Sequence, residues 1–372
     1  MTAGPIESLS RYHLLGQSGL RVSPLSLGTM AFGTDFGWGM PAERAHQILS
    51  RYLEAGGNFI DTADGYTAGS SERIIGDYFA QHGGRDRAVI ATKFTANGSP
   101  GDPNAGGNGR KNIYRALEAS LRRLKTDYVD LYWVHLWDGL TPVEEVMQTL
   151  TTLVREGKVR HIGLSDVPAW YFARAQTLAE RNGWERVVAL QLEYSLAERN
   201  IEREHIPAAL ALGAAITPWS PLAGGLLTGK YTREGNQPKG EGRAHAILQS
   251  VPLVAEKFLK DRPWALLDEV LAVARAVERT PAQVALNWVA TRPGVGSTLV
   301  GASSLAQLED NLHALDFTLP SELSARLEKA SRPELLHPYV FFESPFFTRG
   351  MVAGNTSVTA EPAWFRGPLQ TP

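Results

Sequence analysis

The chain contains no cysteine among its 372 residues. This absence excludes disulfide bonds, catalysis by a thiolate and metal sites built on cysteine. The chain also lacks an imbalance of charge, because 37 lysine and arginine residues face 39 aspartate and glutamate residues and no block of like charges occurs. We therefore expect neither a nucleic acid nor a membrane surface as a partner.

Long apolar segments are missing too. No apolar run approaches the roughly 20 residues that a membrane-spanning helix needs. Residues 1–15 lack the basic start and apolar core of a secretion signal. The sequence therefore predicts a cytoplasmic protein that acts on a small molecule, without a metal site. Assembly into a homo-oligomer stays open.

What the chain does have is a regular alternation of short apolar runs with segments whose apolar residues recur at helical spacing. This alternation predicts parallel strands joined by helices, and eight such pairs predict an α/β protein with a (β/α)8 TIM barrel. The turn-rich residues 16–19 predict an N-terminal β-hairpin that covers the barrel floor. The expected strands are 25–27, 59–61, 89–92, 129–134, 159–164, 187–192, 214–218 and 298–300. The clearest expected helices are 42–55, 113–124, 143–155, 170–181, 264–278 and 282–289.

The length allows one large barrel or two ordinary domains, and the alternation favours a single domain over 1–372, with its barrel at about 12–330. Thr141-Pro142 and Thr280-Pro281 each predict a helix start with threonine as the N-cap. Two segments depart from the alternation of strands and helices, namely 220–262 and the tail 335–372, which is rich in proline and phenylalanine. Loops of such length are usually lids or binding loops. We expect both over the C-terminal mouth of the barrel, with the tail packed on the barrel or on a partner.

Four polar residues follow three successive apolar runs: Asp61, Tyr66, Lys93 and His135. Ionisable groups are costly to bury unless they pair, and the carboxyl ends of barrel strands converge at one mouth, so these residues are expected to form one cluster. A lysine cation stabilises a nearby phenolate, which suits a tyrosine for proton exchange with an alkoxide. No nucleophile is evident. A redox step with a separate hydride donor therefore fits better than hydrolysis or isomerisation on the same barrel.

Several ordered motifs resemble the aldo-keto reductases, over nearly the whole chain up to about residue 315: LGTMAFG (27–33), GNFIDTADGYTAGSSERIIG (57–76), ATK (91–93), VHLWD (134–138) and GLSD (163–166). The resemblance is to the long-loop branch, which includes bacterial enzymes and potassium-channel β subunits. It implies NADP(H)-dependent, reversible reduction of an aldehyde or ketone to an alcohol. Tyr66 would donate the proton, Lys93 and Asp61 would tune it, and His135 would orient the carbonyl. The alternative is a nucleotide-binding sensor with slow turnover, like the channel subunits.

The resemblance also implies a binding site for extended NADP(H), with NAD(H) as an alternative. The residues expected to contact the cofactor are Gly28, Thr29, Met30, Asp61, Ser165, Asp166, Gln191, Trp219, Ser220, Pro221, Leu222, Gly224, Lys230, Arg243, Gly301, Ser303, Gln307, Asp310 and Asn311. Among them, Trp219 would stack on the nicotinamide ring. The family usually has asparagine in place of Asp166. It often has a basic residue where this chain has Ser303-Ser304.

Aromatic residues in the loops predict an apolar substrate pocket. We expect Phe32, Trp38 and Trp137 to line it together with Tyr66 and His135. Trp133, which precedes Trp137 on the other side of the strand end, is expected to be packing only. A lone histidine or tryptophan at such a position is often structural. Their occurrence together, in order, favours the catalytic interpretation.

Overall fold

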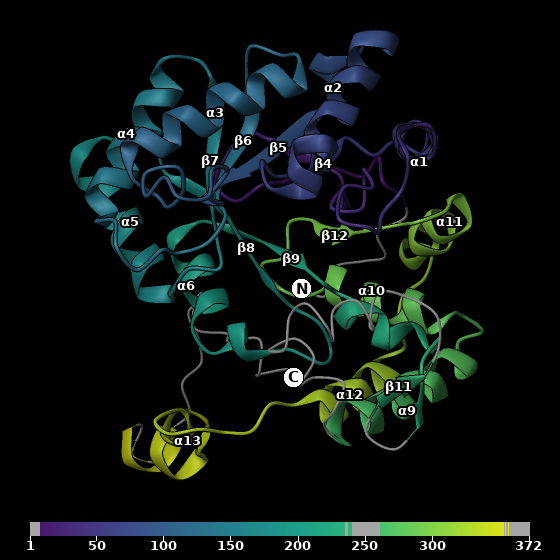
Figure 1. Cartoon of the computed structure of the whole chain (residues 1–372). Coiled ribbons are helices and arrows are strands. Elements are labelled where there is room, and N and C mark those ends of the chain that lie inside the picture. The colour runs from purple at the N-terminus through teal and green to yellow at the C-terminus, as the bar shows by residue number, and fades with distance from the viewer. Residues whose placement is uncertain (1–7, 235–236, 240–260, 353, 355, 357–372) are drawn as a thin grey trace.

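The computed structural model describes residues 8–234, 237–239, 261–352, 354 and 356. At its centre eight parallel strands form one sheet in the order β12-β3-β4-β5-β6-β7-β8-β9, surrounded by helices (Figure 1). Each strand lies within two residues of its predicted bounds. The strands are β3 (Leu25–Gly28), β4 (Phe59–Asp61), β5 (Val89–Phe94), β6 (Val129–Val134), β7 (Val159–Ser165), β8 (Val187–Glu193), β9 (Ala215–Trp219) and β12 (Thr298–Val300).

Backbone hydrogen bonds close this sheet into a barrel. Strand β12 pairs in parallel with β3. On its other side, the residues just before β12 meet β9: the amide of Ile216 donates to the carbonyl of Gly294 at 2.8 Å, and the amide of Gly296 donates to the carbonyl of Ile216 at 2.9 Å. The (β/α)8 barrel expected from the sequence is therefore confirmed.

The helices follow the strands in the expected alternation, and all six expected segments are helical. The helices of the described residues are α1 (Ala42–Glu54), α2 (Ser70–His82), α3 (Arg110–Leu124), α4 (Val143–Arg155), α5 (Ala169–Asn182), α6 (His205–Leu212), α9 (Asp261–Ala276), α10 (Pro281–Ala290), α11 (Leu305–Leu312), α12 (Ser321–Ser331) and α13 (Tyr339–Glu343). Thr280 caps α10 as predicted, by accepting from the amide of Gln283 at 3.2 Å. The same prediction for Thr141 is wrong. Pro142 is the N-cap of α4, and the hydroxyl of Thr141 donates to Asp138 at 2.7 Å instead.

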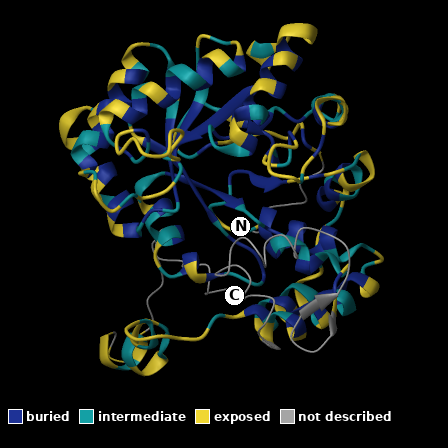
Figure 2. Ribbon diagram, viewed as in Figure 1, coloured by how far each residue is buried: buried dark blue, intermediate teal, exposed yellow. Residues whose placement is uncertain are grey.

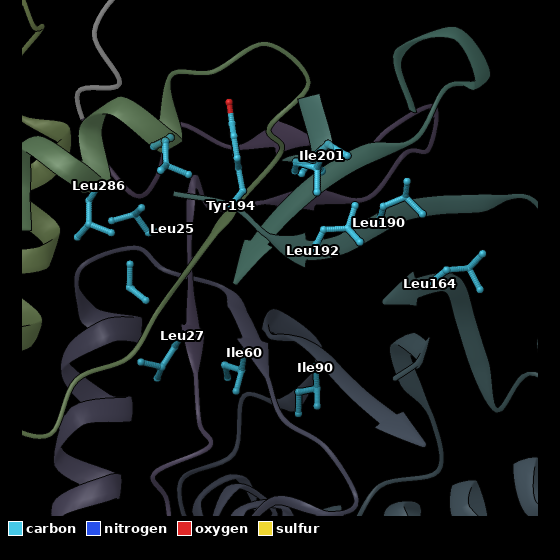
Figure 3. Packing of buried hydrophobic residues seen from close by; sticks show 14 of the residues in the cluster. Leu25, Leu27, Ile60, Ile90, Leu164, Leu190, Leu192, Tyr194, Ile201 and Leu286 are labelled. Carbon is cyan, nitrogen blue, oxygen red and sulfur yellow. The ribbon is translucent and has the colours of Figure 1, made fainter. Parts of the chain in front are cut away.

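Alternate residues of each strand enter two separate cores. Odd and even positions point to opposite faces of a strand, so Ile60 and Ile90 pack outward against the helices, whereas Phe59 and Leu131 fill the barrel interior. Figure 3 shows part of the outer core, with Leu27, Ile60 and Ile90 side by side on neighbouring strands. Figure 2 shows the result: buried strands inside helices whose outer faces are exposed.

The predicted N-terminal hairpin is present as β1 (His13–Leu14) and β2 (Arg21–Val22), which pair antiparallel. Leu15 and Val22 are fully buried in the interior core together with Phe59. Gly16 lies so close to the barrel that a β-carbon there would come within 2.3 Å of the carbonyl oxygen of Val188. Only glycine fits this approach, and the hairpin covers the barrel floor.

The two long segments are partly described. After β9 the chain forms η4 (Ala223–Thr228), then the hairpin β10 (Thr232–Glu234) and β11 (Gln237–Lys239). The tail forms α13 and the π-helix η6 (Phe346–Val352), with α13 at the lower left of Figure 1, apart from the barrel strands. Phe342 and Phe346 are 58% and 71% exposed. This stretch therefore leaves apolar surface in solvent, and packing on a partner stays a prediction. In the described ranges no helix has the length and apolarity needed to cross a membrane.

Candidate active site

The candidate residues gather at the carboxyl ends of the strands, inside the barrel, because every second side chain of a strand points to the same face. Asp61 lies two positions after the interior residue Phe59, and Lys93 two positions after Ala91. Gln191 stands in the same relation to Ala189. These side chains therefore form the top layer of the barrel interior, above an apolar lower layer.

Asp61 is the centre of this layer. Lys93 Nζ donates to Asp61 Oδ1, and both side chains are fully buried. The other carboxylate oxygen, Oδ2, accepts from Trp133 Nε1 at 3.1 Å and from Gln191 Nε2 at 3.0 Å. Lys93 Nζ also donates to Tyr66 Oη at 3.2 Å, so the lysine bridges the carboxylate and the phenol. The buried charges are thus paired, as the sequence predicts.

Trp133 was not expected in this cluster. Its indole N–H holds Asp61, and its ring covers Gly163, where a β-carbon would lie 2.2 Å from Trp133 Cε3. The signal was available, because Trp133 lies two positions before His135 and therefore faces the same side of β6.

The protonation states follow from burial and from Lys93. Burial disfavours the charged lysine, but Asp61 and Tyr66 outweigh it and raise the pKa of Lys93, which stays a cation. Burial raises the pKa of Tyr66, and the attraction of Lys93 opposes this only in part. The sequence had suggested an easily formed phenolate; the resting tyrosine instead keeps its proton. Burial, helped by Lys93, lowers the pKa of His135 to about 3, so the imidazole is neutral.

Tyr66 lies in a turn that contacts with neighbouring residues hold in place. Its ring packs edge-on against His135, with ring centroids 5.8 Å apart. The next residues, Thr67 and Ala68, have left-handed backbone angles (φ 45° and 53°). The Thr67 hydroxyl donates to the carbonyl of Phe32 at 2.6 Å. Strained turns of this kind persist where surrounding contacts fix them, and they often position functional side chains.

A second acidic group lies beneath the turn. Asp64 Oδ1 is buried and has no hydrogen-bond partner within the described part of the chain. Nearby Glu72 accepts from the Thr92 hydroxyl at 2.5 Å and from Arg123 at 2.6 Å. Burial, then the charge of Glu72, raise the pKa of Asp64 to about 7, while Arg123 opposes the shift.

Asp166 lies beside the cluster of Asp61, Lys93 and Tyr66, directly after the end of β7. Its backbone is left-handed (φ 45°), its amide donates to the carbonyl of Gln191 at 3.1 Å, and its Oδ1 accepts from Trp219 Nε1 at 3.1 Å. The preceding Ser165 is buried. Four of the residues expected near nicotinamide are therefore brought together by three adjacent strands.

The loop after β9 brings its own backbone close to the ammonium group of Lys230. Ser220 is also left-handed (φ 53°), and its hydroxyl accepts from the amide of Gly224 at 3.1 Å. Pro221 is buried and Leu222 half-buried. A β-carbon on Gly225 would lie 3.3 Å from Lys230 Nζ, so the missing side chain leaves room for the ammonium over the loop. Arg243 lies outside the described residues.

The residues expected near adenosine cluster at the start of α11. Both the amide and the hydroxyl of Ser303 donate to Gln307 Oε1, at 2.9 and 2.7 Å. Asn311 Nδ2 donates to the carbonyl of Gly301 at 3.2 Å. The carboxylate of Asp310 instead bonds within the protein: it accepts a hydrogen bond from Gln283 at 2.8 Å and so connects α11 to α10.

The residues expected after the first strand fall into two groups. Gly28 ends β3 and Met30 is 38% exposed, but the hydroxyl of Thr29 is buried and donates to the carbonyl of Asp61 at 2.9 Å. Phe32 is only 1% exposed and lies in the outer core. Its side chain is thus packed away from solvent, and we leave it out of the proposed pocket.

The loops of the mouth carry exposed aromatic side chains. Trp137 packs edge-on against Trp170, with ring centroids 5.7 Å apart, and Trp170 is 57% exposed. The amide of Trp137 donates to the carbonyl of Asp166 at 3.3 Å, which places this pair beside the polar layer. Trp38 pairs with Phe36 at 6.1 Å. Phe36 was expected, with Phe32 and Trp38, as an aromatic residue of the loop after the first strand that could line substrate space, whereas Trp170 was not anticipated as a pocket residue.

A (β/α)8 barrel with a buried lysine joining an aspartate to a tyrosine at its mouth has the form of a barrel enzyme that moves protons. Within the described ranges no cluster of metal-ligating side chains accompanies it. The family model for the aldo/keto reductase family matches residues 24–332, and the chain belongs to this family. Membership places it among oxidoreductases that act on carbonyl and alcohol groups with a nicotinamide cofactor.

Three relatives illustrate the similarity. The chain is 38% identical to the uncharacterized oxidoreductase YrpG of Bacillus subtilis, over 84% of this chain and 93% of the relative. It is 36% identical to norsolorinic acid reductase stcV of Emericella nidulans, over 91% and 86% of the two chains. It is 32% identical to the aryl-alcohol dehydrogenase [NADP(+)] of Phanerodontia chrysosporium, over 91% and 90%.

Proposed function

We propose that the protein catalyses the reversible reduction of aromatic aldehydes or ketones to alcohols with NADP(H), and that Tyr66 is the proton donor. The observation that carries the proposal is the position of Lys93, whose ammonium contacts both Asp61 and the Tyr66 hydroxyl. A buried cation next to a protonated phenol favours release of that proton when a base forms beside it.

The residues at the mouth suit a nicotinamide dinucleotide. Ser165, Asp166 and Gln191 offer polar groups around one spot, with the Trp219 indole beside it. The loop 220–225 and Lys230 offer a cation over uncovered backbone, which suits a phosphate. When bound, the nicotinamide supplies or accepts the hydride. A relative named for NADP(+) supports this cofactor, whereas the uncharged Ser303-Ser304 keeps NAD(H) as an alternative.

Each residue of the cluster has a defined task in this reaction. As a carbonyl oxygen gains negative charge, Tyr66 Oη gives it a proton, and Lys93 stabilises the phenolate left behind. Asp61 fixes Lys93 in place and keeps it charged. His135 is neutral, so one ring nitrogen can donate a hydrogen bond to the carbonyl oxygen and orient it. In the alcohol-oxidising direction Tyr66 Oη takes the proton back.

The substrate class follows from the aromatic side chains at the mouth. Flat aromatic rings pack favourably edge-on or offset against other aromatic rings. Trp137 and Trp170 offer such faces to a molecule that reaches Tyr66. Relatives named aryl-alcohol dehydrogenase and norsolorinic acid reductase support an aromatic substrate.

The test follows nicotinamide absorbance while the protein meets NADPH and nitrobenzaldehyde. Tyr66→Phe removes only the proton-donating hydroxyl and should lower kcat by about 10²- to 10⁴-fold. Tyr114→Phe, on α3, removes a hydroxyl that donates to Glu156 at 3.0 Å far from the barrel interior, and should keep full activity. Bound nucleotide without aldehyde-dependent oxidation in the wild type would instead favour the sensor function.

A further inference from the structure

A second carboxylate lies at the mouth in addition to Asp61. The charge of Asp61 is matched by Lys93 in direct contact. Asp166 has a different environment, because the hydrogen bond to its Oδ1 comes from the uncharged indole of Trp219. Ser165 is its other hydrogen-bonding neighbour, and it is also uncharged. Within the residues that the structure describes, no cation forms an ion pair with Asp166, so its negative charge is not cancelled by direct contact.

We propose that Asp166 makes the site discriminate between the two redox states of its cofactor, by binding the cationic, oxidised nicotinamide more tightly relative to the neutral, reduced one than an uncharged residue would. This inference rests on the proposed function. It concerns the residue at which the chain departs from the asparagine that the family usually has.

The physical reason is charge complementarity in a partly buried site. The oxidised ring carries one positive charge, and the reduced ring, which has gained a hydride, carries none. Asp166 accepts from Trp219, the residue expected against this ring, so its charge acts at short range and through little solvent. An asparagine would offer the same oxygen to the indole without the charge.

The consequence is a bias in the reaction on the protein. Tighter binding of the oxidised cofactor shifts the bound equilibrium toward oxidised cofactor and alcohol. A tenfold preference corresponds to a midpoint potential of the bound cofactor that is lower by about 30 mV, because two electrons are transferred. The bound reduced cofactor is then a stronger reductant than it is in solution, which suits a carbonyl reductase.

The bias should depend on pH. Burial, then Glu193, raise the pKa of Asp166 to about 6, while the hydrogen bond from Trp219 and the charge of Lys93 oppose the shift. Asp61 on β4 and Tyr66, in the turn that follows β4, also face this site. Asp166 is ionised above pH 6 and loses its charge below it, so the preference for the oxidised cofactor should fade as the pH falls through 6.

Asparagine is a suitable substitution at this position. It tolerates left-handed backbone angles better than most residues, and the φ of position 166 is 45°. Its side-chain oxygen can still accept from the indole of Trp219. Asp138→Asn is the matched control, because Asp138 lies in the loop after β6 and its carboxylate holds Leu140 and Thr141 rather than Trp219.

The experiment measures the dissociation constants of NADP⁺ and NADPH by calorimetry at pH 8 and pH 5, for the wild type and both variants. At pH 8 the ratio of the NADPH constant to the NADP⁺ constant should fall roughly tenfold in Asp166→Asn, as a unit charge at short range implies. It should not change in Asp138→Asn. In the wild type alone, the ratio should fall by a similar factor between pH 8 and pH 5, which tests the inference without relying on any variant.

Two outcomes separate this inference from the proposed function. If both nucleotides bind but the ratio is the same in wild type and Asp166→Asn and does not respond to pH, the inference is wrong and the proposed function stands. If the wild type binds neither nucleotide, both are wrong.

Discussion

Asp64→Asn should stabilise the protein at neutral and alkaline pH and have little effect on stability near pH 4. Asp64 lies two residues before Tyr66, and its Oδ1 atom is buried without a hydrogen-bond partner in the described part of the chain. Glu72, whose negative charge acts on Asp64, is fully buried. Asparagine occupies the same space but cannot ionise, so it removes the cost of placing a charge there.

The magnitude follows from proton linkage. The pKa of Asp64 is about 7 in the folded protein and near 3.8 when the chain is unfolded. Between these values the unfolded chain releases the proton while the folded chain keeps it, so the stability of the wild type falls as the pH rises from 4 to 7. A shift of roughly three units at 1.36 kcal/mol each gives at most about 4 kcal/mol. Asp64→Asn should lack this loss, and its advantage should grow from near zero at pH 4 to that value at pH 8.

The assay is urea unfolding followed by circular dichroism at pH 4, 6 and 8. Asp138→Asn is a control whose effect on stability should have the opposite sign. Despite burial, hydrogen bonds from Thr141 and neighbouring amides lower the pKa of Asp138. The stabilising contribution of this carboxylate is therefore present at neutral pH and lost in acid. That variant should be less stable than the wild type at pH 8. A stability difference between Asp64→Asn and wild type that stays constant with pH would refute a buried carboxyl with a raised pKa.

Two further predictions concern the proposed catalytic residues. Lys93→Met leaves the buried Asp61 carboxylate without its cation and should lower the free energy of unfolding by about 3–5 kcal/mol. Adding Asp61→Asn to this variant should recover part of the loss. A Lys93→Met protein as stable as the wild type would contradict the pairing. Because the pKa of His135 is about 3, its imidazole stays neutral between pH 5 and 9 and should add no limb to the pH dependence of kcat in that range. A limb near pH 6.5 in the wild type that His135→Asn removes would show that the histidine is charged.

The strands could be predicted because both of their faces are buried. Residues such as Phe59 and Ile60 contribute to the inner and outer cores respectively, so each strand is a short, continuous apolar run. The joint position of Asp61 and Lys93 followed from the same rule, since adjacent parallel strands end at the same edge. Local sequence was sufficient to predict the features that follow directly from the regular geometry of a β/α barrel.

Other features depend on contacts between distant residues. The two-residue period of β6 places Trp133 on the same face as His135, but the contact of its N–H with Asp61 also requires the barrel to bring β6 and β4 together. Phe32 lies in a loop and was expected in the pocket, yet its side chain enters the outer core. The pKa of Tyr66 depends on burial, which the pairing with Lys93 alone does not reveal.

The hairpin beneath the barrel also determines the order in which molecules can pass. Leu15 and Val22 close the floor, and Trp133 fills the axis above them. The described residues of the floor therefore leave the mouth as the way out for a molecule that has reached Tyr66. In the proposed reaction, cofactor and substrate would both use this mouth, so the one that lies nearer the axis would have to enter first and depart last.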